Sequence, residues 1–309
     1  MIQPTRRTAG RILVQSRNRL ALRILCLMEQ QPRVDFHCHT SASDGSLTPQ
    51  QLLNRAIEAG LDMLAITDHD TIEGYRQLAD KQVTKLQLVS GIELSAVWKT
   101  RGVHIVGLDF DPANDELVAL IKKQQESRQR RAVRIAGKLE KLGIRNALQG
   151  ATKIARDAPL SRVHFAKFLV ETETVKTIKT AFSRYLGAGK PGDIRNEWVS
   201  MEEAVTCLRA AGGVAVLAHP DAYKLTKTKR RALARDFVAA GGEAIEIISG
   251  SQSPELTGQL CALAADLGCA ASIGSDFHSD EQAWRKLGRC GYVPGQLTPV
   301  WETFKPHRW

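Results

Sequence analysis

The sequence of 309 residues predicts an α/β fold with a helical insertion. Short apolar runs alternate along the chain with amphipathic runs of helical spacing. Repeated units of a strand followed by a helix predict a parallel sheet, either doubly wound or closed into a barrel. Between residues 114 and 195 the strand pattern stops and only helical patterns remain, which predicts an insertion in the α/β body.

The strands and helices of the body are predicted from apolar runs and from their boundary residues. We predict strands at Val34–Phe36, Met63–Ile66, Leu86–Val89, Val103–Leu108, Val214–Leu217, Ala244–Ile248 and Ala270–Ile273. We predict helices at Pro49–Ala59, Ile72–Lys81, Met201–Ala211, Lys227–Ala240 and Pro254–Leu267. Thr48 and Ser253 each precede a proline, which is a common start of a helix, and Gly60 and Gly268 are typical helix ends.

Four helical segments are predicted in the insertion. They are Glu116–Leu142, Ala147–Arg156, Val163–Val170 and Val175–Leu186. The domain organisation that follows has a body made of residues 34–113 and 196–309, interrupted by the insertion at 114–195.

The charge of the chain is unevenly distributed. Lys and Arg number 43 against 33 Asp and Glu, so the formal net charge is +10. Residues 1–33 carry +6, the insertion carries +10, and the remaining residues carry −6. A net positive charge favours contact with polyanions such as nucleic acid, without specifying a fold. Hydrophobic residues at 43% and charged residues at 25% are ordinary for a globular protein and exclude a fibrous or disordered one.

The first 33 residues are read as a basic extension outside the fold. They are rich in arginine and poor in acidic residues, which also resembles an organellar transit peptide. Met28 stands just before the first predicted strand and could be the native start, so residues 1–27 are expected to be disordered or untranslated. No apolar run is long enough for a membrane span, and none is predicted.

The six cysteines do not form a metal-binding or redox motif. No pair has the Cys-x-x-Cys spacing, and a disulfide scaffold is not expected in a chain of this length without an export signal. Reduced thiols in a cytoplasmic protein are therefore expected. Nothing in the sequence points to a protein partner.

Histidines and carboxylates gather at the predicted strand ends. They are His37, His39, Asp44, His69, Glu93, His104, His219, Asp276 and His278. Strand alternation places His37 and His39 on one side of the chain, and likewise Asp276 and His278. Catalytic groups of α/β proteins collect at the carboxyl ends of strands. We therefore expect these side chains to converge.

Nine imidazole and carboxylate groups would be costly to bury without partners, and metal ions remove that cost. Mixed His and carboxylate ligands suit Mn²⁺, Fe²⁺ or Zn²⁺, and nine ligands need more than one ion. Two or three divalent ions can hold a phosphate, activate water and stabilise a leaving oxygen. The pattern therefore predicts metal-assisted hydrolysis of a phosphate ester. A nucleic-acid-binding module that keeps metals only for structure is the alternative from another class.

Several motifs carry a resemblance to a known family. HCHTSASDGSLTP, LAITDHDTIEGY, VSGIELSAVW, VHIVGLDF, AVLAHPD and IGSDFH resemble the PHP (polymerase and histidinol phosphatase) family of metal-dependent phosphoesterases. The resemblance runs from Val34 to about Gly295. Within the family the chain is most similar to enzymes that act on nucleoside 3′,5′-bisphosphates and trim RNA from its 5′ end, through LSRVHFAKFLV and YLGAGKPGDIRNEW in the insertion.

The resemblance implies a distorted seven-stranded (β/α) barrel with three metal ions, most commonly manganese, with zinc, iron or magnesium as alternatives. One ion would take His37, His39, Glu93 and Asp276; a second Glu93, His104 and His219; a third Asp44, His69 and His278. Asp276, Glu93 and His219 are the predicted catalytic residues. Asp35, Asp68 and Asp70 are expected to orient the ligands.

The resemblance also implies that Arg162 and His164 bind a substrate phosphate, with Arg134, Lys190 and Arg195 as further candidates. A guanidinium suits bidentate phosphate contact, but a solvated basic face would also explain these residues. His307 is read as a surface residue. The expected activity is 5′-3′ exoribonuclease, nucleoside 3′,5′-bisphosphate 3′-phosphatase, or both, acting on 5′-phosphorylated RNA or a bisphosphate nucleotide. The alternative is a phosphatase of small monoesters such as histidinol phosphate.

Overall fold

The computed structural model describes residues 31–81, 85–194 and 197–305. The predictions for residues 1–30, for Arg195 and for His307 lie outside the described residues. The strands are β1 (Val34–Asp35), β2 (Met63–Ala65), β3 (Gln87–Val89), β4 (Gly91–Trp98), β5 (Arg101–Leu108), β6 (Val199–Ser200), β7 (Val214–Leu217), β8 (Ala244–Ser249) and β9 (Ala270–Gly274). The body helices are α2 (Pro49–Glu58), α3 (Glu73–Ala79), α8 (Met201–Ala210), α9 (Lys227–Ala239) and α10 (Pro254–Leu267). A 3₁₀ turn, η2 (Val300–Thr303), follows β9.

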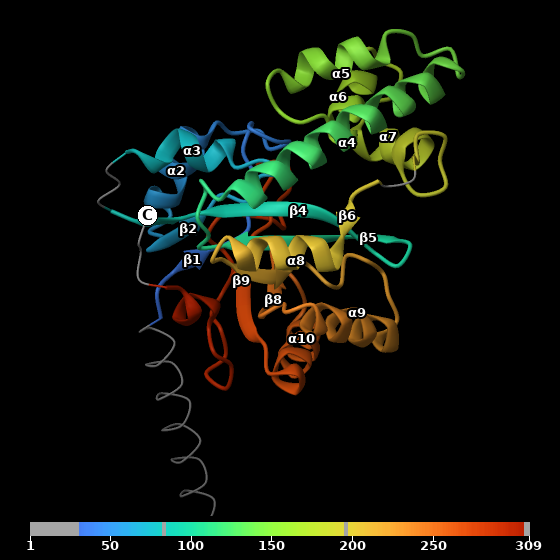
Figure 1. The fold of residues 1–309 in the computed structure, drawn as a ribbon. Helices are drawn as coiled ribbons and strands as arrows, with labels where there is room; N and C mark the ends of the chain where they lie inside the picture. The colour runs from blue at the N-terminus through green and yellow to red at the C-terminus, as the bar shows by residue number, and fades with distance from the viewer. Residues whose placement is uncertain (1–30, 82–84, 195–196, 306–309) are drawn as a thin grey trace, which may run out of the picture.

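The strands form two sheets around the core of the body (Figure 1). One sheet is parallel with the order β1-β2-β3, and the other has the order β6-β4-β5-β7-β8-β9. Within the described residues these ladders do not close, so the seven-stranded barrel is not confirmed. Backbone hydrogen bonds outside the ladders join the two sheets at two places. Phe36 N donates to Ile273 O at 3.2 Å, and Glu93 N donates to Asp68 O at 3.2 Å.

The expectation of an all-parallel sheet was wrong at strands β4 and β5. Strand β4 was not predicted as a strand, and it pairs antiparallel with β5 through a turn of two residues, Lys99 and Thr100. A connection this short permits only antiparallel pairing. Strand β5 also pairs antiparallel with β7. As a result His104, near the start of β5, lies beside the carboxyl end of β7, where Ala218 N donates to His104 O at 3.2 Å.

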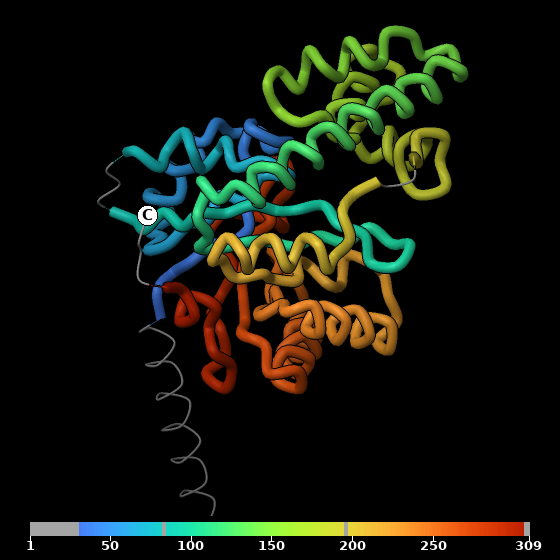
Figure 2. The backbone as a smooth tube through the Cα atoms, in the orientation of Figure 1, coloured from blue at the N-terminus to red at the C-terminus, as the bar shows by residue number. Residues whose placement is uncertain are grey.

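The insertion is helical, as the pattern predicts, and lies on one side of the body (Figure 2). Its helices are α4 (Asp115–Glu140), α5 (Ala147–Ala155), α6 (Arg162–Glu171) and α7 (Ile178–Ala181), followed by a π-helical turn, η1 (Phe182–Leu186). The single helix predicted at Val175–Leu186 was wrong. Thr177 caps the helix by accepting from Thr180 N, so helix α7 starts later, and the π-helical turn continues it.

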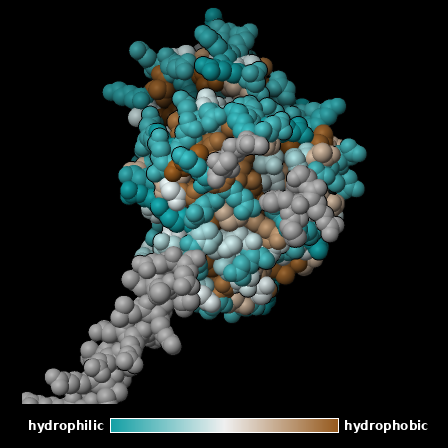
Figure 3. Space-filling view, turned by 90° about the vertical axis from the view of Figure 1, so that its left-hand side faces the viewer, coloured by the Kyte–Doolittle hydropathy of each residue, from teal (hydrophilic) through white to brown (hydrophobic). Residues whose placement is uncertain are grey.

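Helix α4 connects the two parts of the molecule. Leu117 and Leu120 in its first half pack in the core of the body, whereas Ile135 and Leu139 in its second half pack in a separate core within the insertion. The helix therefore carries side chains from the body to the insertion across one continuous element. None of the described helices is both long enough and apolar enough to span a membrane. The face shown in Figure 3 is mostly hydrophilic, with apolar side chains in smaller patches.

Candidate metal centre and adjoining cavity

The structure brings all nine predicted metal ligands together. His37, His39 and Asp44 follow β1, His69 follows β2, Glu93 lies in β4, His104 in β5, His219 follows β7, and Asp276 and His278 follow β9. They form four overlapping groups whose ligand atoms lie within 4.8 Å of one another inside each group. Both sheets therefore contribute to one cluster.

Glu93 lies at the centre of this cluster and is fully buried. Its Oε1 is 2.8 Å from His104 Nδ1 and 2.8 Å from His219 Nε2. Its Oε2 is within 3.3 Å of a ring nitrogen of His37, His39 and His69. One carboxylate thus faces five imidazoles, with its two oxygens turned to different sets. That is the arrangement expected of a carboxylate shared between two ions.

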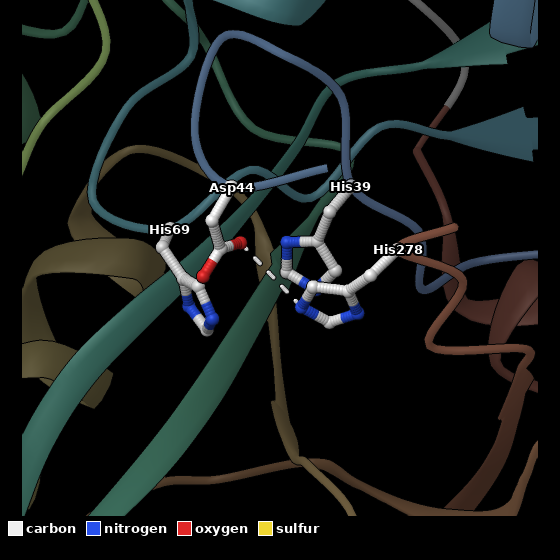
Figure 4. A group of neighbouring side chains, drawn as sticks. All are labelled: His39, Asp44, His69 and His278. Atoms are coloured by element: carbon white, nitrogen blue, oxygen red, sulfur yellow. Dashed lines mark ion pairs between the residues drawn. The ribbon is translucent and has the colours of Figure 1, made fainter. Parts of the chain in front are cut away.

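A second group joins His39, Asp44, His69 and His278 (Figure 4). Asp44 Oδ1 is 3.5 Å from His278 Nε2, and the rings of His39 and His278 stack with centroids 4.1 Å apart. Asp276 connects this group to the first, because its Oδ1 lies 3.3 Å from His39 Nε2.

Buried atoms without hydrogen-bond partners test whether the cluster fits metal ions. Within the part of the chain that the structure describes, such atoms in the cluster are His37 Nε2, His39 Nδ1 and Nε2, Asp44 Oδ1, His69 Nδ1, Glu93 Oε2 and His219 Nδ1. Each buried polar group without a partner costs about 1–3 kcal/mol. Imidazole nitrogens and carboxylate oxygens are the donors that Mn²⁺, Fe²⁺ and Zn²⁺ accept, so the cluster fits divalent cations.

The pKa values of four ligands favour the forms that bind metal. Burial lowers the pKa of His69 to about 4 and that of His278 to about 3, so both rings are neutral at pH 7. Burial alone would raise the pKa of Asp44 and of Glu93, but the surrounding histidines hold both below the usual range. His37 differs. Burial opposes its protonation, yet Glu246 and Glu93 raise its pKa to about 10.

Glu246, on β8, is a functional residue that the sequence analysis missed. Its Oε1 is 2.9 Å from His37 Nδ1, and its Oε2 accepts a hydrogen bond from His219 N at 2.5 Å. A carboxylate on the far nitrogen of a ligating imidazole sets the orientation of the ring. The available signal was a single carboxylate within the apolar run AIEIIS, where a buried charge requires a partner.

Asp68 orients the loop that carries Asp44. Its carboxylate accepts hydrogen bonds from Thr40 N at 2.7 Å, from Thr40 Oγ1 at 2.6 Å and from Ser43 Oγ at 2.6 Å. Asp35 accepts from Ser275 N at 2.9 Å, which positions the residue before Asp276. These contacts agree with the orienting role expected for both carboxylates.

A cavity of about 580 Å³ opens onto the metal ligands. Its lining includes the predicted ligands Asp44, His69, His104 and His278, together with Arg128, Arg131, Arg162, Phe182, Trp198 and Tyr223. Arg128 is fixed in place, because its Nε donates to Asp70 Oδ2 at 2.7 Å and its Nη2 donates to Ser95 Oγ at 3.0 Å. Asp70 follows the ligand His69 directly. The arginines of the cavity and the metal ligands are therefore rigidly connected.

Arg131 is the arginine whose environment most favours an anion. It is 9% exposed, and its Nε has no hydrogen-bond partner among the described residues. Burial, with Arg162 and Arg128 close by, lowers the pKa of Arg131 to about 9. An anion between these guanidinium groups would remove their mutual repulsion and satisfy the free donor. Arg128 and Arg131 were not predicted, although their spacing of three residues places them on one face of a helix.

The predicted substrate residues are not all brought to this cavity. Arg162 lines it, with its Nη1 donating to Leu186 O at 3.2 Å. Arg134 forms an exposed ion pair with Glu197 and does not line the cavity, and neither does the exposed Lys190. His164 is buried with both ring nitrogens in use. Its Nδ1 accepts from Ser161 N at 3.0 Å, and its Nε2 lies 3.1 Å from Ser43 O. That geometry supports a positioning role for His164.

Comparison with protein families matches residues 35–239 to the PHP domain. The chain belongs to the PHP-domain family. Among curated PHP relatives, a Haemophilus influenzae protein named 5′-3′ exoribonuclease is 40% identical, over 88% of this chain and 99% of its own length. A Chromobacterium violaceum protein named 3′,5′-nucleoside bisphosphate phosphatase is 39% identical, over 87% of this chain and 95% of its own.

A solved structure from Chromobacterium violaceum has a similar fold. That protein is described as an amidohydrolase with bound sulfate and no metal; it is 38% identical, with a TM-score of 0.82 over 88% of this chain and 95% of that one. The PHP chain described above combines two chemical capacities. Its histidine and carboxylate cluster can hold divalent cations, and the arginines of the adjoining cavity can hold an anion at a fixed place beside them.

Proposed function

We propose that this PHP protein is a metal-dependent phosphoesterase that hydrolyses nucleotide phosphate esters, as a 5′-3′ exoribonuclease, a nucleoside 3′,5′-bisphosphate 3′-phosphatase, or both. The observation that carries the proposal is a cavity whose lining includes both the predicted metal ligands and the arginines Arg128, Arg131 and Arg162. Such a cavity suits a substrate with two phosphates. The names of the relatives, an exoribonuclease and a bisphosphate phosphatase, support both activities.

The ligand groups are consistent with three ions, of which manganese is our first choice. Glu93 would be shared between two of them, with Asp276 and His219 completing their ligand sets. When bound, divalent cations supply charge stabilisation for phosphate oxygens and activate water. Arg131 and Arg162 hold the second phosphate and align the ester with the cluster. A bisphosphate nucleotide would release its 3′-phosphate, and RNA would release one 5′-mononucleotide per cycle.

The domain organisation fits this division of roles. We place the metal centre in a body made of residues 34–113 and 196–309, and the phosphate-holding arginines in the insertion at 114–195. The two sheets, joined by backbone hydrogen bonds at both ends, support a distorted barrel. The five described cysteines are free and buried, which suits the reducing cytoplasm.

Substrate comparison tests the proposal directly. Rates are measured with Mn²⁺ on adenosine 3′,5′-bisphosphate, a 5′-phosphorylated oligoribonucleotide and histidinol phosphate. We expect hydrolysis of the first two, with mononucleotides released from the RNA 5′ end, and little of the third, because it carries no second phosphate for Arg131. A preference for histidinol phosphate would establish the small-monoester alternative. RNA binding without cleavage would indicate the non-catalytic module.

The Asp276→Asn variant should keep the fold and lose turnover by more than roughly 10²-fold.

The arginines of the cavity have their own test. Arg131→Gln removes a buried guanidinium without a change of backbone, and a charge-assisted hydrogen bond contributes about 1.5–3 kcal/mol. We therefore expect KM for adenosine 3′,5′-bisphosphate to rise roughly 10- to 100-fold. Arg134→Gln is the matched control, since Arg134 is exposed and paired with Glu197, and it should stay within about twofold. Equal effects in both variants would count against a specific phosphate site.

A further inference from the structure

A strip of basic side chains begins at the mouth of the cavity. Arg101, in the β4–β5 hairpin, and Lys224, after β7, both line the cavity and are both exposed, so they lie at its rim. From Lys224 the chain leads directly into helix α9, where Lys227 and Lys229 are exposed. In Figure 1 the tip of the hairpin and the segment leading into α9 lie on the same side of the molecule.

The strip keeps its positive charge because the nearby acidic residues are already engaged. Asp221 pairs with Arg230 at 3.1 Å, and Asp266 pairs with Arg231 at 2.7 Å. Within the described ranges, Lys227 and Lys229 have no ion-pair partner within 4.0 Å. Their charge is therefore available to an external anion.

Helix stability does not account for these lysines. The first turn of α9 contains no acidic residue, although basic side chains there oppose the helix dipole. Helices α8 and α10 instead carry acidic residues in the first turn, where they favour the helix dipole: Glu202 and Glu203 in α8, and Glu255 in α10. The start of α9 therefore carries basic residues at a small cost to the helix, which indicates a contact outside the helix.

The strip is also fixed relative to the metal centre. Arg101 Nη1 donates to Tyr223 O at 3.1 Å, and the Tyr223 hydroxyl accepts from His104 N at 2.8 Å and donates to Ala218 O at 2.9 Å. The segment that starts the strip is thus bound to a ligand-bearing strand and to the residue before His219.

We propose that Lys227 and Lys229 form a track for the RNA strand on the 3′ side of the scissile bond, with Arg101 and Lys224 at its entrance. The inference rests on the proposed function and extends it. Neither Lys227 nor Lys229 lines the cavity, so a mononucleotide within it does not require them, whereas a longer RNA leaving the mouth meets them. The cavity then serves both substrates, and the strip distinguishes them by length.

The test compares two double variants that remove the same charge. Lys227→Gln/Lys229→Gln neutralises the strip, and Lys138→Gln/Lys141→Gln neutralises two exposed lysines at the far end of α4. Binding of a 5′-phosphorylated ten-nucleotide RNA is measured by fluorescence anisotropy with Mn²⁺, over a series of salt concentrations, in the Asp276→Asn background so that the RNA is not cleaved. kcat/KM is measured with Mn²⁺ for the same RNA and for adenosine 3′,5′-bisphosphate.

We expect the strip variant to bind RNA about tenfold more weakly at low salt. The slope of log Kd against log salt concentration should be shallower by about 1.4, because each of the two lost phosphate contacts lowers that slope by about 0.7. Its kcat/KM for RNA should fall similarly, while that for the bisphosphate stays unchanged. The α4 variant should match the unmodified protein. Equal RNA binding by the strip variant, or equal losses in both variants, would overturn the track. Absence of RNA binding by the unmodified protein would overturn it too, while bisphosphate hydrolysis would still stand.

Discussion

Glu93 shows how one buried residue organises the site. It is 0% exposed, and both of its oxygens are occupied by imidazoles from other segments of the chain. A buried carboxylate in this position requires positive charge, from protonated histidines or from metal ions. The pKa of His37 is raised to about 10, so that ring supplies one positive charge near neutral pH, which Glu93 shares with Glu246. His69 and His278, with pKa values of about 4 and 3, are neutral there, and these rings are free to bind metal ions.

His164 allows the positioning role and the phosphate-binding role to be separated. Burial lowers its pKa to about 4, against about 6.5 in the unfolded chain, so the unfolded state binds the additional proton between these values. Its neutral form therefore stabilises the fold above pH 6.5, and this stability is lost as the pH falls toward 4. His164→Gln keeps a donor for Ser43 O and an acceptor for Ser161 N, and does not titrate.

The free energy of unfolding of the metal-free protein should fall when the pH is lowered from 7 to 4.5. We expect this fall to be roughly 2–3 kcal/mol smaller in His164→Gln than in the unmodified protein. Urea titrations in EDTA at the two pH values measure it. An unchanged pH dependence, with a large rise in KM for the bisphosphate, would instead show that His164 binds phosphate.

Among the elements, strand β9 and the segment after β1 approach so closely that only glycine fits. A Cβ on Gly274 would lie 2.3 Å from His37 Cβ and 2.8 Å from His37 N. Gly274→Ala must therefore displace a metal ligand, and overpacking of this kind costs about 1–3 kcal/mol. We expect lower stability and weaker Mn²⁺ binding, measured by urea unfolding and by metal titration.

Gly258 in α10 supplies the control, because nothing lies within 4 Å of a Cβ at that position. Gly258→Ala should leave metal binding unchanged and raise stability by about 0.5–1 kcal/mol. If the two variants behave alike, the close approach of Gly274 to His37 has no functional consequence.

The sequence allowed most elements and the ligand set to be predicted, because these depend on local patterns. The helix starts at Pro49 and Pro254 follow from their caps, and the ligands follow from motifs after apolar runs. Strand β4 was missed although Ile92, Leu94 and Ala96 alternate with Glu93 and Ser95, and the structure buries both sets of side chains. The place of His104 beside β7 depends on the pairing of β5 with β7, which is distant in sequence and which the local pattern does not contain.

For the same reason the arginines of the cavity could not be chosen from the sequence. The insertion contains many basic residues of similar local pattern, and only packing separates the buried Arg131 from the exposed Arg134. Glu246 was missed for a related reason, since its partners His37 and His219 are distant in sequence and meet it only after the sheet has formed.

At the scale of the whole molecule, the ligands come from both sheets. His37, His39 and His69 follow strands of the three-stranded sheet, whereas Glu93, His104 and Asp276 belong to or follow strands of the other sheet. Among the described residues, the hydrogen-bond ladders do not join these sheets continuously. Bound cations would therefore crosslink the two halves of the body. Their positive charge would also partly offset the net charge of −6 in residues 34–113 and 196–309.

Removal of metal should consequently destabilise the entire fold as well as the activity. An ion that binds only the folded state at 1,000 times its Kd contributes about 4 kcal/mol. With an unfolding entropy of about 2.1 cal/mol/K per residue, that corresponds to a rise of roughly 6 °C in Tm for a protein of this size. We expect the EDTA-treated protein to melt lower by at least this amount than the protein with Mn²⁺, in scanning calorimetry at matched ionic strength. Asp276→Asn should show a smaller difference. Equal Tm values with and without Mn²⁺ would mean that the cations do not hold the two sheets together.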